Sequence, residues 1–243
     1  MSVYAISNLA DLLNTNEYPG RGIVIGKSAD GNSIAVAYFI MGRSNNSRNR
    51  IFTEEGDTVT IYPADSRKVE DPSLIIYHPI RRIGSNLIVT NGDQTDTIYE
   101  FLKDGNSFEE ALETRRFEPD GPNWTPRISG LVQLDGSERY KMSILKAEDA
   151  EGKHCARYTY SYHLENGLGH FIHTYQHNGD PIPTFCGEPE RITIPDSAEE
   201  MADLIWNNLN EDNKISLYVR YINVVSGQVE NRMINKYTQV KEG

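Results

Sequence analysis

Two short apolar runs joined by a turn signal constrain the fold more than any other feature of this chain. Residues 22–26 (Gly-Ile-Val-Ile-Gly) and 34–40 (Ile-Ala-Val-Ala-Tyr-Phe-Ile) flank Asp30-Gly31, a dipeptide typical of hairpin turns. Neither run alternates apolar and polar residues, as a strand with one solvated face would. We therefore expect two paired strands that are covered on both faces, inside a layered sheet structure.

The rest of the chain carries signals for more strands and a few helices. Further strands are expected at 58–62, 74–83, 86–90, 127–134, 139–146, 154–162, 170–177, 214–224 and 228–239. Helices are expected at 5–13, at 95–103, from Ser107 to Arg116 and after Ser197, because each of these two serines has a glutamate three residues later. No linker or low-complexity tract interrupts the pattern. It predicts one α+β domain over residues 1–243 with stacked sheets.

Composition narrows the function classes. The net charge of −11 comes without the basic stripe of a nucleic-acid-binding protein, although a few local arginines can still bind phosphate. Two cysteines, Cys155 and Cys186, cannot form a disulfide framework, and no apolar run approaches the ~18 residues of a membrane span. No signal peptide is apparent. We expect a soluble cytoplasmic protein that binds neither nucleic acid nor membrane.

Polar clusters follow the expected strands and suggest where chemistry takes place. Residues 42–50 combine three arginines with three asparagines, which suits bidentate binding of a phosphate: Arg43, Arg48, Arg50, Asn45, Asn46 and Asn49. Tyr77 precedes Arg81, and a tyrosine beside a cation can donate a proton or stabilise an oxyanion. A solvated loop and an ordinary strand tyrosine are the alternatives.

Two further clusters lie at the ends of expected elements. Asn91, Gly92 and Asp93 form a turn before a helix, whose amides could bind an anion or a carboxamide in addition to capping the helix. Glu118 and Asp120 precede Thr125-Pro126-Arg127 and could supply a general base with an arginine that positions it. Both carboxylates could equally be exposed loop residues.

Three histidines in residues 167–177 raise the question of a zinc site. On a strand, His173 and His177 share one face while His170 lies on the other, so the three do not converge. We therefore expect no metal, and contacts from His173 and Tyr175 to a ligand or to Glu188. Cys186 is expected to be a buried structural cysteine.

In order and spacing, these clusters resemble the archaeal-type inosine monophosphate (IMP) cyclohydrolase family. The matching strings lie in about residues 18–134: Tyr18-Pro19-Gly20-Arg21 with 23–26, Arg43-Ser44, Asn49-Arg50, Tyr77 with Ile80-Arg81, 90–98, 117–120 and 125–128. The resemblance implies a four-layered αββα sandwich like that of the N-terminal-nucleophile hydrolases. It also implies closure of 5-formamidoimidazole-4-carboxamide ribotide to IMP with loss of water, without metal or cofactor.

The resemblance also assigns site residues. Arg50, Tyr77 and Glu118 fall on positions associated with catalysis. Substrate-binding positions are expected on the matching strings at Arg21, Arg43, Asn49, Asn91, Gly92, Asp93, Thr125 and Arg127, and, outside them, at His173 and Tyr175 of the histidine-containing segment. The partner is a small purine nucleotide, and the edge strands of the sheets make a homo-oligomer possible.

Two other functions fit the same inventory. A purine-nucleotide sensor would keep the pocket without turnover. An amide hydrolase on the same fold would need a nucleophile, for which Ser2, Cys155 and Cys186 are the candidates.

Overall fold

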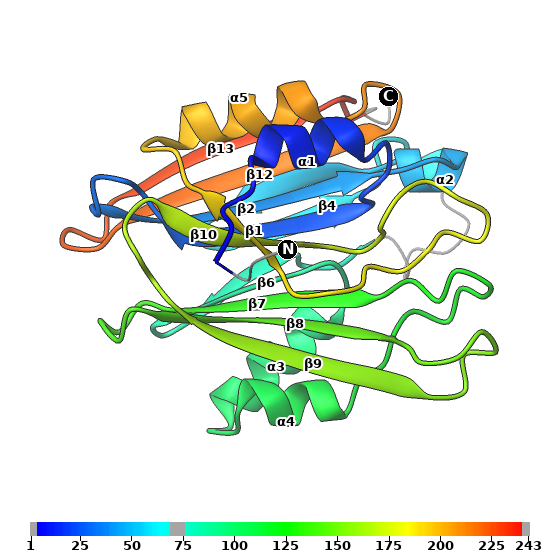
Figure 1. The fold of residues 1–243 in the computed structure, drawn as a ribbon, viewed down its shortest axis with the longest axis horizontal. Helices are drawn as coiled ribbons and strands as arrows, with labels where there is room; N and C mark the ends of the chain where they lie inside the picture. The colour runs from blue at the N-terminus through cyan, green and yellow to red at the C-terminus, as the bar shows by residue number, and fades with distance from the viewer. Residues whose placement is uncertain (1–3, 69–75, 240–243) are drawn as a thin grey trace.

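The computed structural model describes residues 4–68 and 76–239. In these ranges the chain forms two stacked antiparallel sheets with helices on the outer face of each (Figure 1). Helices α1 (Leu9–Thr15) and α5 (Ala198–Asn208) cover one sheet, and α3 (Gln94–Lys103) and α4 (Phe108–Glu113) cover the other. The expected α+β class and αββα layer order are confirmed.

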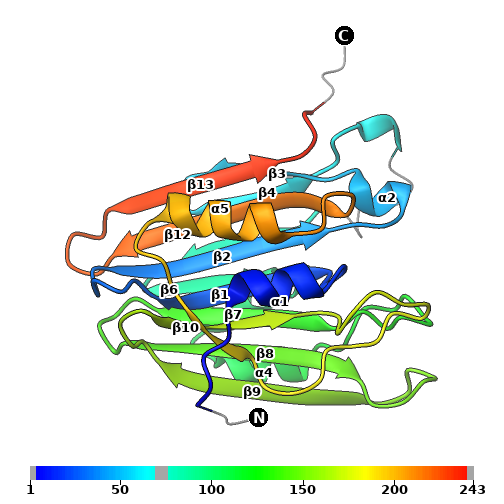
Figure 2. The ribbon, with the colours of Figure 1, turned by 45° about the horizontal axis from the view of Figure 1, so that its top comes forward.

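The first sheet has six strands in the described residues, and all neighbours in it are antiparallel (Figure 2). Its spatial order is β11 (Glu190–Thr193), β10 (Leu168–His173), β1 (Arg21–Lys27), β2 (Ser33–Met41), β12 (Lys214–Asn223) and β13 (Val229–Asn235).

The second sheet has seven strands in the same ranges, again antiparallel throughout. Its spatial order is β3 (Ile51–Glu55), β4 (Thr58–Tyr62), β5 (Ile80–Ile83), β6 (Asn86–Thr90), β7 (Arg127–Gln133), β8 (Arg139–Ala147) and β9 (Cys155–His163). Two short helical turns complete the described elements: α2 (Asn45–Arg48) follows β2 in the chain, and η1 (Ser66–Lys68) follows β4.

The central hairpin β1–β2 is buried on both faces, as its uninterrupted apolar pattern predicts. Ile23 and Ile25 pack in the core between the two sheets, whereas Val24 packs in the separate core under α1 and α5. Alternate side chains of a strand point to opposite faces, so a strand between two apolar layers needs apolar residues at every position. The hairpin thus forms the centre of the sandwich.

Most predicted elements are confirmed, and their differences have local causes. The strand expected at 74–83 begins only at Ile80, because Pro79 has no N–H to donate to the ladder; residues 74 and 75 lie outside the described ranges. The strand expected at 170–177 runs from 168 and ends at His173, after which the Thr174 and Tyr175 N–H groups donate to Pro19 O.

Helix boundaries follow the capping side chains. Asn8 Oδ1 accepts from the amides of Ala10 and Asp11, so the first helix begins at Leu9 rather than at residue 5. Ser107 and Glu110 form the expected capping box, but that helix ends at Glu113. Ser197 caps α5 through the Glu200 amide. None of the helices in the described ranges has the length and hydropathy needed to span a membrane.

Candidate active site

A cavity of about 410 Å³ opens at one end of the sandwich, where β1 begins and β2 ends. Its walls come from four parts of the chain: the residues around β1, the segment 43–50, the loop 118–125 and the segment 175–182. The lining residues are Tyr18, Arg21, Arg43, Ser44, Asn46, Ser47, Arg50, Glu118, Pro119, Asp120, Asn123, Thr125, Tyr175 and Ile182. The cavity has the size of a small-molecule site.

Two buried arginines without partners define its electrostatics. Arg21 and Arg50 are 8% and 6% exposed, and neither guanidinium forms a hydrogen bond or ion pair with a described residue. Arg21 Nε and both Nε and Nη1 of Arg50 are buried without an acceptor in residues 4–68 and 76–239. Burial and the neighbouring charge of Arg21 lower the pKa of Arg50. A buried charge without a hydrogen-bond or ion-pair partner is costly, so two such arginines are suited to binding an anionic group, although the Glu118 carboxylate also acts on both.

Tyr77 lies close enough to both arginines for them to act on its pKa, but it is not one of the residues that line the cavity. It is 6% exposed, and its hydroxyl lies 3.0 Å from the hydroxyl of Tyr38 on β2. Burial raises the pKa of Tyr77, although Arg50 and Arg21 act to lower it. Tyr77 is therefore a neutral phenol at physiological pH, which makes it a proton or hydrogen-bond donor rather than a base.

The loop that carries Glu118 is fixed by hydrogen bonds at its two ends. The Glu118 N–H donates to Thr125 O at 2.9 Å, and the Thr125 N–H donates to Asp120 Oδ1 at 2.7 Å. Thr125 Oγ1 lies 2.6 Å from the Tyr175 hydroxyl. No described residue forms a hydrogen bond or ion pair with the Glu118 carboxylate. Asp120 is thus occupied by the loop, whereas Glu118 is available in the cavity.

Tyr18 and Tyr175 form an aromatic wall. Their rings stack with centroids 5.8 Å apart, and the Arg43 guanidinium lies 5.2 Å from the centroid of the Tyr18 ring. Arg43 Nη1 also donates to Asn178 Oδ1 and Gly179 O, so this arginine ties the rim of the cavity to a neighbouring loop. Such a wall suits packing against a planar heterocycle.

Four of the residues expected to bind substrate form a separate structural network. Asn91 donates to Pro126 O and accepts from the Ile128 N–H and from Gln94 Nε2. Arg127 Nη1 is 2.7 Å from Asp93 Oδ1, and a Cβ on Gly92 would meet the same guanidinium. Burial acts to raise the pKa of Asp93, but Arg127 and Arg115 hold it below its ordinary value. None of these four lines the cavity.

Asn49 and His173 also lie outside the lining. Asn49 exchanges two hydrogen bonds with the Asp65 backbone. His173 Nδ1 donates to Tyr175 O at 2.8 Å, and its Nε2 lies 3.4 Å from Glu190 Oε1 rather than bonding to Glu188, one of the two partners expected. His173 therefore holds the backbone of Tyr175 in place from outside the cavity.

The segment 170–177 does not bring its histidines together. His177 lies beyond the strand, exposed, with Nδ1 bonded to Asn178 O. In the described residues no group of three His, Cys, Asp or Glu side chains is placed to hold a metal ion. The expectation that Cys186 is buried is wrong, because its side chain is exposed. Ser2 lies outside the described residues.

Two lining residues and one residue that contacts Tyr77 gave no signal in the sequence. Asn123 and Ile182 belong to loops without a recognisable motif, and Tyr38, which contacts Tyr77, lies inside an apolar run. Only the approach of segments distant in the chain reveals them.

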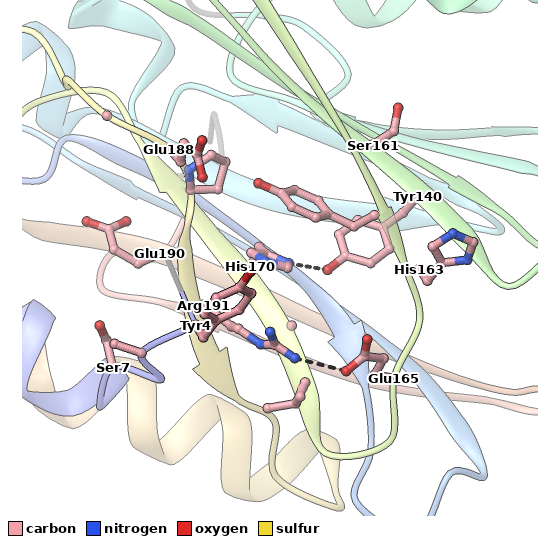
Figure 3. Close-up of a pocket in the computed structure, with 16 residues that line it drawn as sticks. Tyr4, Ser7, Tyr140, Ser161, His163, Glu165, His170, Glu188, Glu190 and Arg191 are labelled. Carbon is pink, nitrogen blue, oxygen red and sulfur yellow. Dashed lines mark hydrogen bonds and ion pairs between the residues drawn. The ribbon is translucent and has the colours of Figure 1, made fainter. Parts of the chain in front are cut away.

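A second hollow of about 600 Å³ lies between β9 and β10, at the edge where the two sheets separate. His170 Nδ1 is 2.5 Å from the Tyr140 hydroxyl and the His170 ring stacks on Tyr162 at 3.6 Å between centroids, while Arg191 pairs with Glu165 (Figure 3). None of the predicted site residues lines this hollow.

Known proteins with similar sequences point to one family. The profile of the IMP cyclohydrolase-like protein family matches residues 18–227. The IMP cyclohydrolase of Methanocaldococcus jannaschii is 32% identical over 193 residues, which cover 78% of this chain and 86% of that protein. That of Methanococcus aeolicus is 31% identical over 163 residues, 65% of this chain and 74% of the relative. The IMP cyclohydrolase of Methanopyrus kandleri is 34% identical over 146 residues, which cover 56% of this chain and 72% of that protein. The resemblance seen in the sequence is confirmed: the chain belongs to the IMP cyclohydrolase-like family.

Proposed function

We propose that this chain is an IMP cyclohydrolase, which closes 5-formamidoimidazole-4-carboxamide ribotide to IMP with loss of water. One observation carries the proposal: two buried, unpaired arginines lie with Tyr77 and Glu118 in and beside a cavity of small-molecule size. Membership in a family whose relatives bear this name supports the same reaction.

The reaction sets clear demands on a site. The carboxamide nitrogen attacks the formyl carbon and forms the new C–N bond. The formyl oxygen then leaves as water, with one proton from the carboxamide nitrogen and one from the formamido nitrogen. Because an amide nitrogen is a poor nucleophile, a base must accept its proton as the bond forms, and donors must stabilise the charge on the formyl oxygen.

The residues beside the cavity meet these demands. We assign to Tyr77 the donation of a hydrogen bond to the formyl oxygen, because burial keeps its phenol protonated. Glu118 is assigned the proton of the attacking nitrogen, since no described residue occupies its carboxylate. Arg50, with Arg21 beside it, stabilises the negative charge that develops at that end of the cavity.

Orientation supplies much of the remaining rate. The two reacting groups belong to one molecule, so the enzyme has to hold them in one rotamer with their atoms in contact. The stacked rings of Tyr18 and Tyr175 offer a flat wall for the imidazole, and Arg43 at the rim offers a third positive charge to a nucleotide.

Ultraviolet absorbance tests the proposal directly. Purified protein mixed with the formylated carboxamide ribotide should form IMP, and a metal chelator should not change the rate. Tyr77→Phe and Glu118→Gln should each lower kcat by roughly 10²-fold or more, with smaller changes in KM. Tyr221→Phe is the matched control, because its hydroxyl bonds to Pro195 O in a part of the chain remote from the cavity lining. IMP binding without turnover would instead identify a nucleotide sensor, and wild-type rates in both variants would remove the two assignments.

We also propose that the enzyme works in the cytoplasm on a free nucleotide. Both cysteines are unpaired thiols, as a reducing compartment favours. The exposed outer strands β9 and β13 support a further proposal of self-association, which sedimentation velocity would test.

A further inference from the structure

Tyr38 is a buried tyrosine with no role in the site described so far. It lies on β2 with no measurable exposure, and its backbone pairs with Ile23 of β1 and Tyr218 of β12. Its ring stacks on Phe52 with centroids 5.7 Å apart. In the described part of the chain, its hydroxyl has one hydrogen-bond partner, the hydroxyl of Tyr77 at 3.0 Å.

Burial decides which of the two hydroxyls, that of Tyr38 or that of Tyr77, donates the hydrogen bond between them. A buried O–H without an acceptor loses a hydrogen bond that it would make in water. Because the Tyr77 oxygen is the acceptor within reach, Tyr38 donates and Tyr77 accepts. The proton of Tyr77 must then point away from Tyr38.

The surroundings of Tyr77 restrict where that proton can go. Arg50 and Arg21, the charges that act most strongly on Tyr77, carry only N–H donors and cannot accept it. Among the described residues Glu118 is the carboxylate that acts on Tyr77, so we take Glu118 or a ligand in the cavity as the acceptor.

We propose that Tyr38 is a positioning residue, whose hydroxyl proton occupies Tyr77 so that the Tyr77 proton is directed towards the substrate. This inference rests on the proposed function, in which Tyr77 donates to the formyl oxygen. The bond from Tyr38 also acts to lower the pKa of Tyr77, against the effect of burial, which strengthens the phenol as a donor.

The rigidity of Tyr38 suits this role. Three neighbouring strands fix its backbone, and the stacked Phe52 ring limits rotation of its own ring. Tyr77, by contrast, lies outside the named strands and joins the sheet through its carbonyl, which accepts from the Ile61 N–H at 3.0 Å. Tyr38, fixed on the central strand β2, thus sets the orientation of the Tyr77 hydroxyl.

A double-mutant cycle tests the proposal. Tyr38→Phe should lower kcat by about 10-fold and leave KM within about 2-fold, because the donor is misdirected while the binding groups stay in place. Tyr38→Phe combined with Tyr77→Phe should be no slower than Tyr77→Phe alone, because Tyr38 acts through Tyr77. Tyr221→Phe, which also removes a hydroxyl bonded at 2.9 Å, should keep the wild-type kcat.

Two results would overturn the positioning role: a wild-type kcat in Tyr38→Phe, or a loss that adds in full to that of Tyr77→Phe. The second would show that Tyr38 acts on the structure generally. Thermal melts of all variants check that each is folded.

A measurement without turnover separates this proposal from the proposed function. In protein labelled at the tyrosine Cζ carbons, Tyr38→Phe should shift the Tyr77 resonance, which Tyr77→Phe identifies, and Tyr221→Phe should leave it in place. In the unsubstituted protein the Tyr38 hydroxyl proton should exchange slowly with water. If the wild type forms no IMP but these signals behave as described, the proposed reaction fails and the Tyr38–Tyr77 arrangement stands. An unmoved Tyr77 resonance refutes the arrangement.

Discussion

At the scale of single residues, the two kinds of buried arginine in this chain differ in their partners. Arg220 is 1% exposed and is paired with Glu54 at 2.9 Å and Asp57 at 3.3 Å. Arg50 is 6% exposed and forms no hydrogen bond or ion pair with a described residue, and the Glu118 carboxylate acts on it only electrostatically. A charge kept without a partner lowers stability, so its retention indicates a function in binding or catalysis.

Arg50→Met should therefore make the protein more stable and less active. Replacing the unpaired guanidinium with an apolar chain of similar length should raise the free energy of unfolding by about 1–3 kcal/mol. The same change should lower kcat/KM for ring closure by roughly 10²-fold or more. Denaturant unfolding and the absorbance assay measure the two effects.

Arg220→Met is the matched control for that prediction. It leaves Glu54 without its cation and Asp57 with Arg82 alone, 3.6 Å away, and should lower the free energy of unfolding by about 1–3 kcal/mol, a range that allows for the partial exposure of both carboxylates. If Arg50→Met also loses stability, then Arg50 has a partner in the folded protein and is not held ready for an anion.

At the scale of elements, Asn91 joins three of them at one point. Its side chain donates to Pro126 O and accepts from the Ile128 N–H, which fixes the end of β6 to the start of β7, and it accepts from Gln94 at the start of α3. Asn91 is 1% exposed, so water cannot replace these bonds if the side chain is removed.

Asn91→Ala should affect stability far more than catalysis. Leaving buried groups unpaired should lower the free energy of unfolding by about 2–4 kcal/mol. KM and kcat, measured well below the melting temperature, should change by less than about 3-fold, because Asn91 does not line the cavity. A KM raised 10-fold or more with an unchanged melting temperature would return Asn91 to the substrate-binding residues.

This junction also shows which part of the site the sequence can predict. Local signals were sufficient for the hairpin at Asp30-Gly31 and for the Ser107 capping box, because their partners lie within a few residues. The sequence missed β3 and β11, which are short outer strands without such signals. The sequence identified the polar clusters at the strand ends, but it did not show which of these clusters face the cavity. Asn91 bonds to residues more than thirty positions away, and that geometry has no local signature.

At the scale of the whole molecule, the two sheets are joined by a polar contact where they separate. His170 of β10 belongs to the six-stranded sheet and Tyr140 of β8 to the seven-stranded one, and their side chains bond at 2.5 Å (Figure 3). Tyr162 stacks on the same imidazole, and Arg191 is the charged group that acts on it. Burial first, and then Arg191, lower the pKa of His170 to about 4.

That low pKa predicts a pH-dependent stability. The folded protein keeps His170 neutral down to a pKa of about 4, whereas the unfolded chain binds a proton below about 6.5. The stability that the neutral His170 gives to the folded state is therefore fully present above pH 6.5. It is lost as the pH falls from 6.5 to 4, and below pH 4 no further loss occurs. Because His170 is only partly buried, we expect a loss of about 1–2 kcal/mol across this window.

Denaturant unfolding at pH values from 4 to 7.5 checks this prediction. His170→Gln can still accept a hydrogen bond from Tyr140 but does not titrate, so it should flatten the part of the slope between pH 6.5 and 4. His163→Gln, on the exposed face of β9, is the matched control and should retain the wild-type slope. An unchanged slope in His170→Gln would mean that His170 binds a proton in the folded state as readily as in the unfolded chain, so that the fold does not lower its pKa. In that case the protonated His170 present below about pH 6.5 would donate from Nδ1 to the Tyr140 oxygen, and the contact between the two sheets would have the opposite polarity in that pH range.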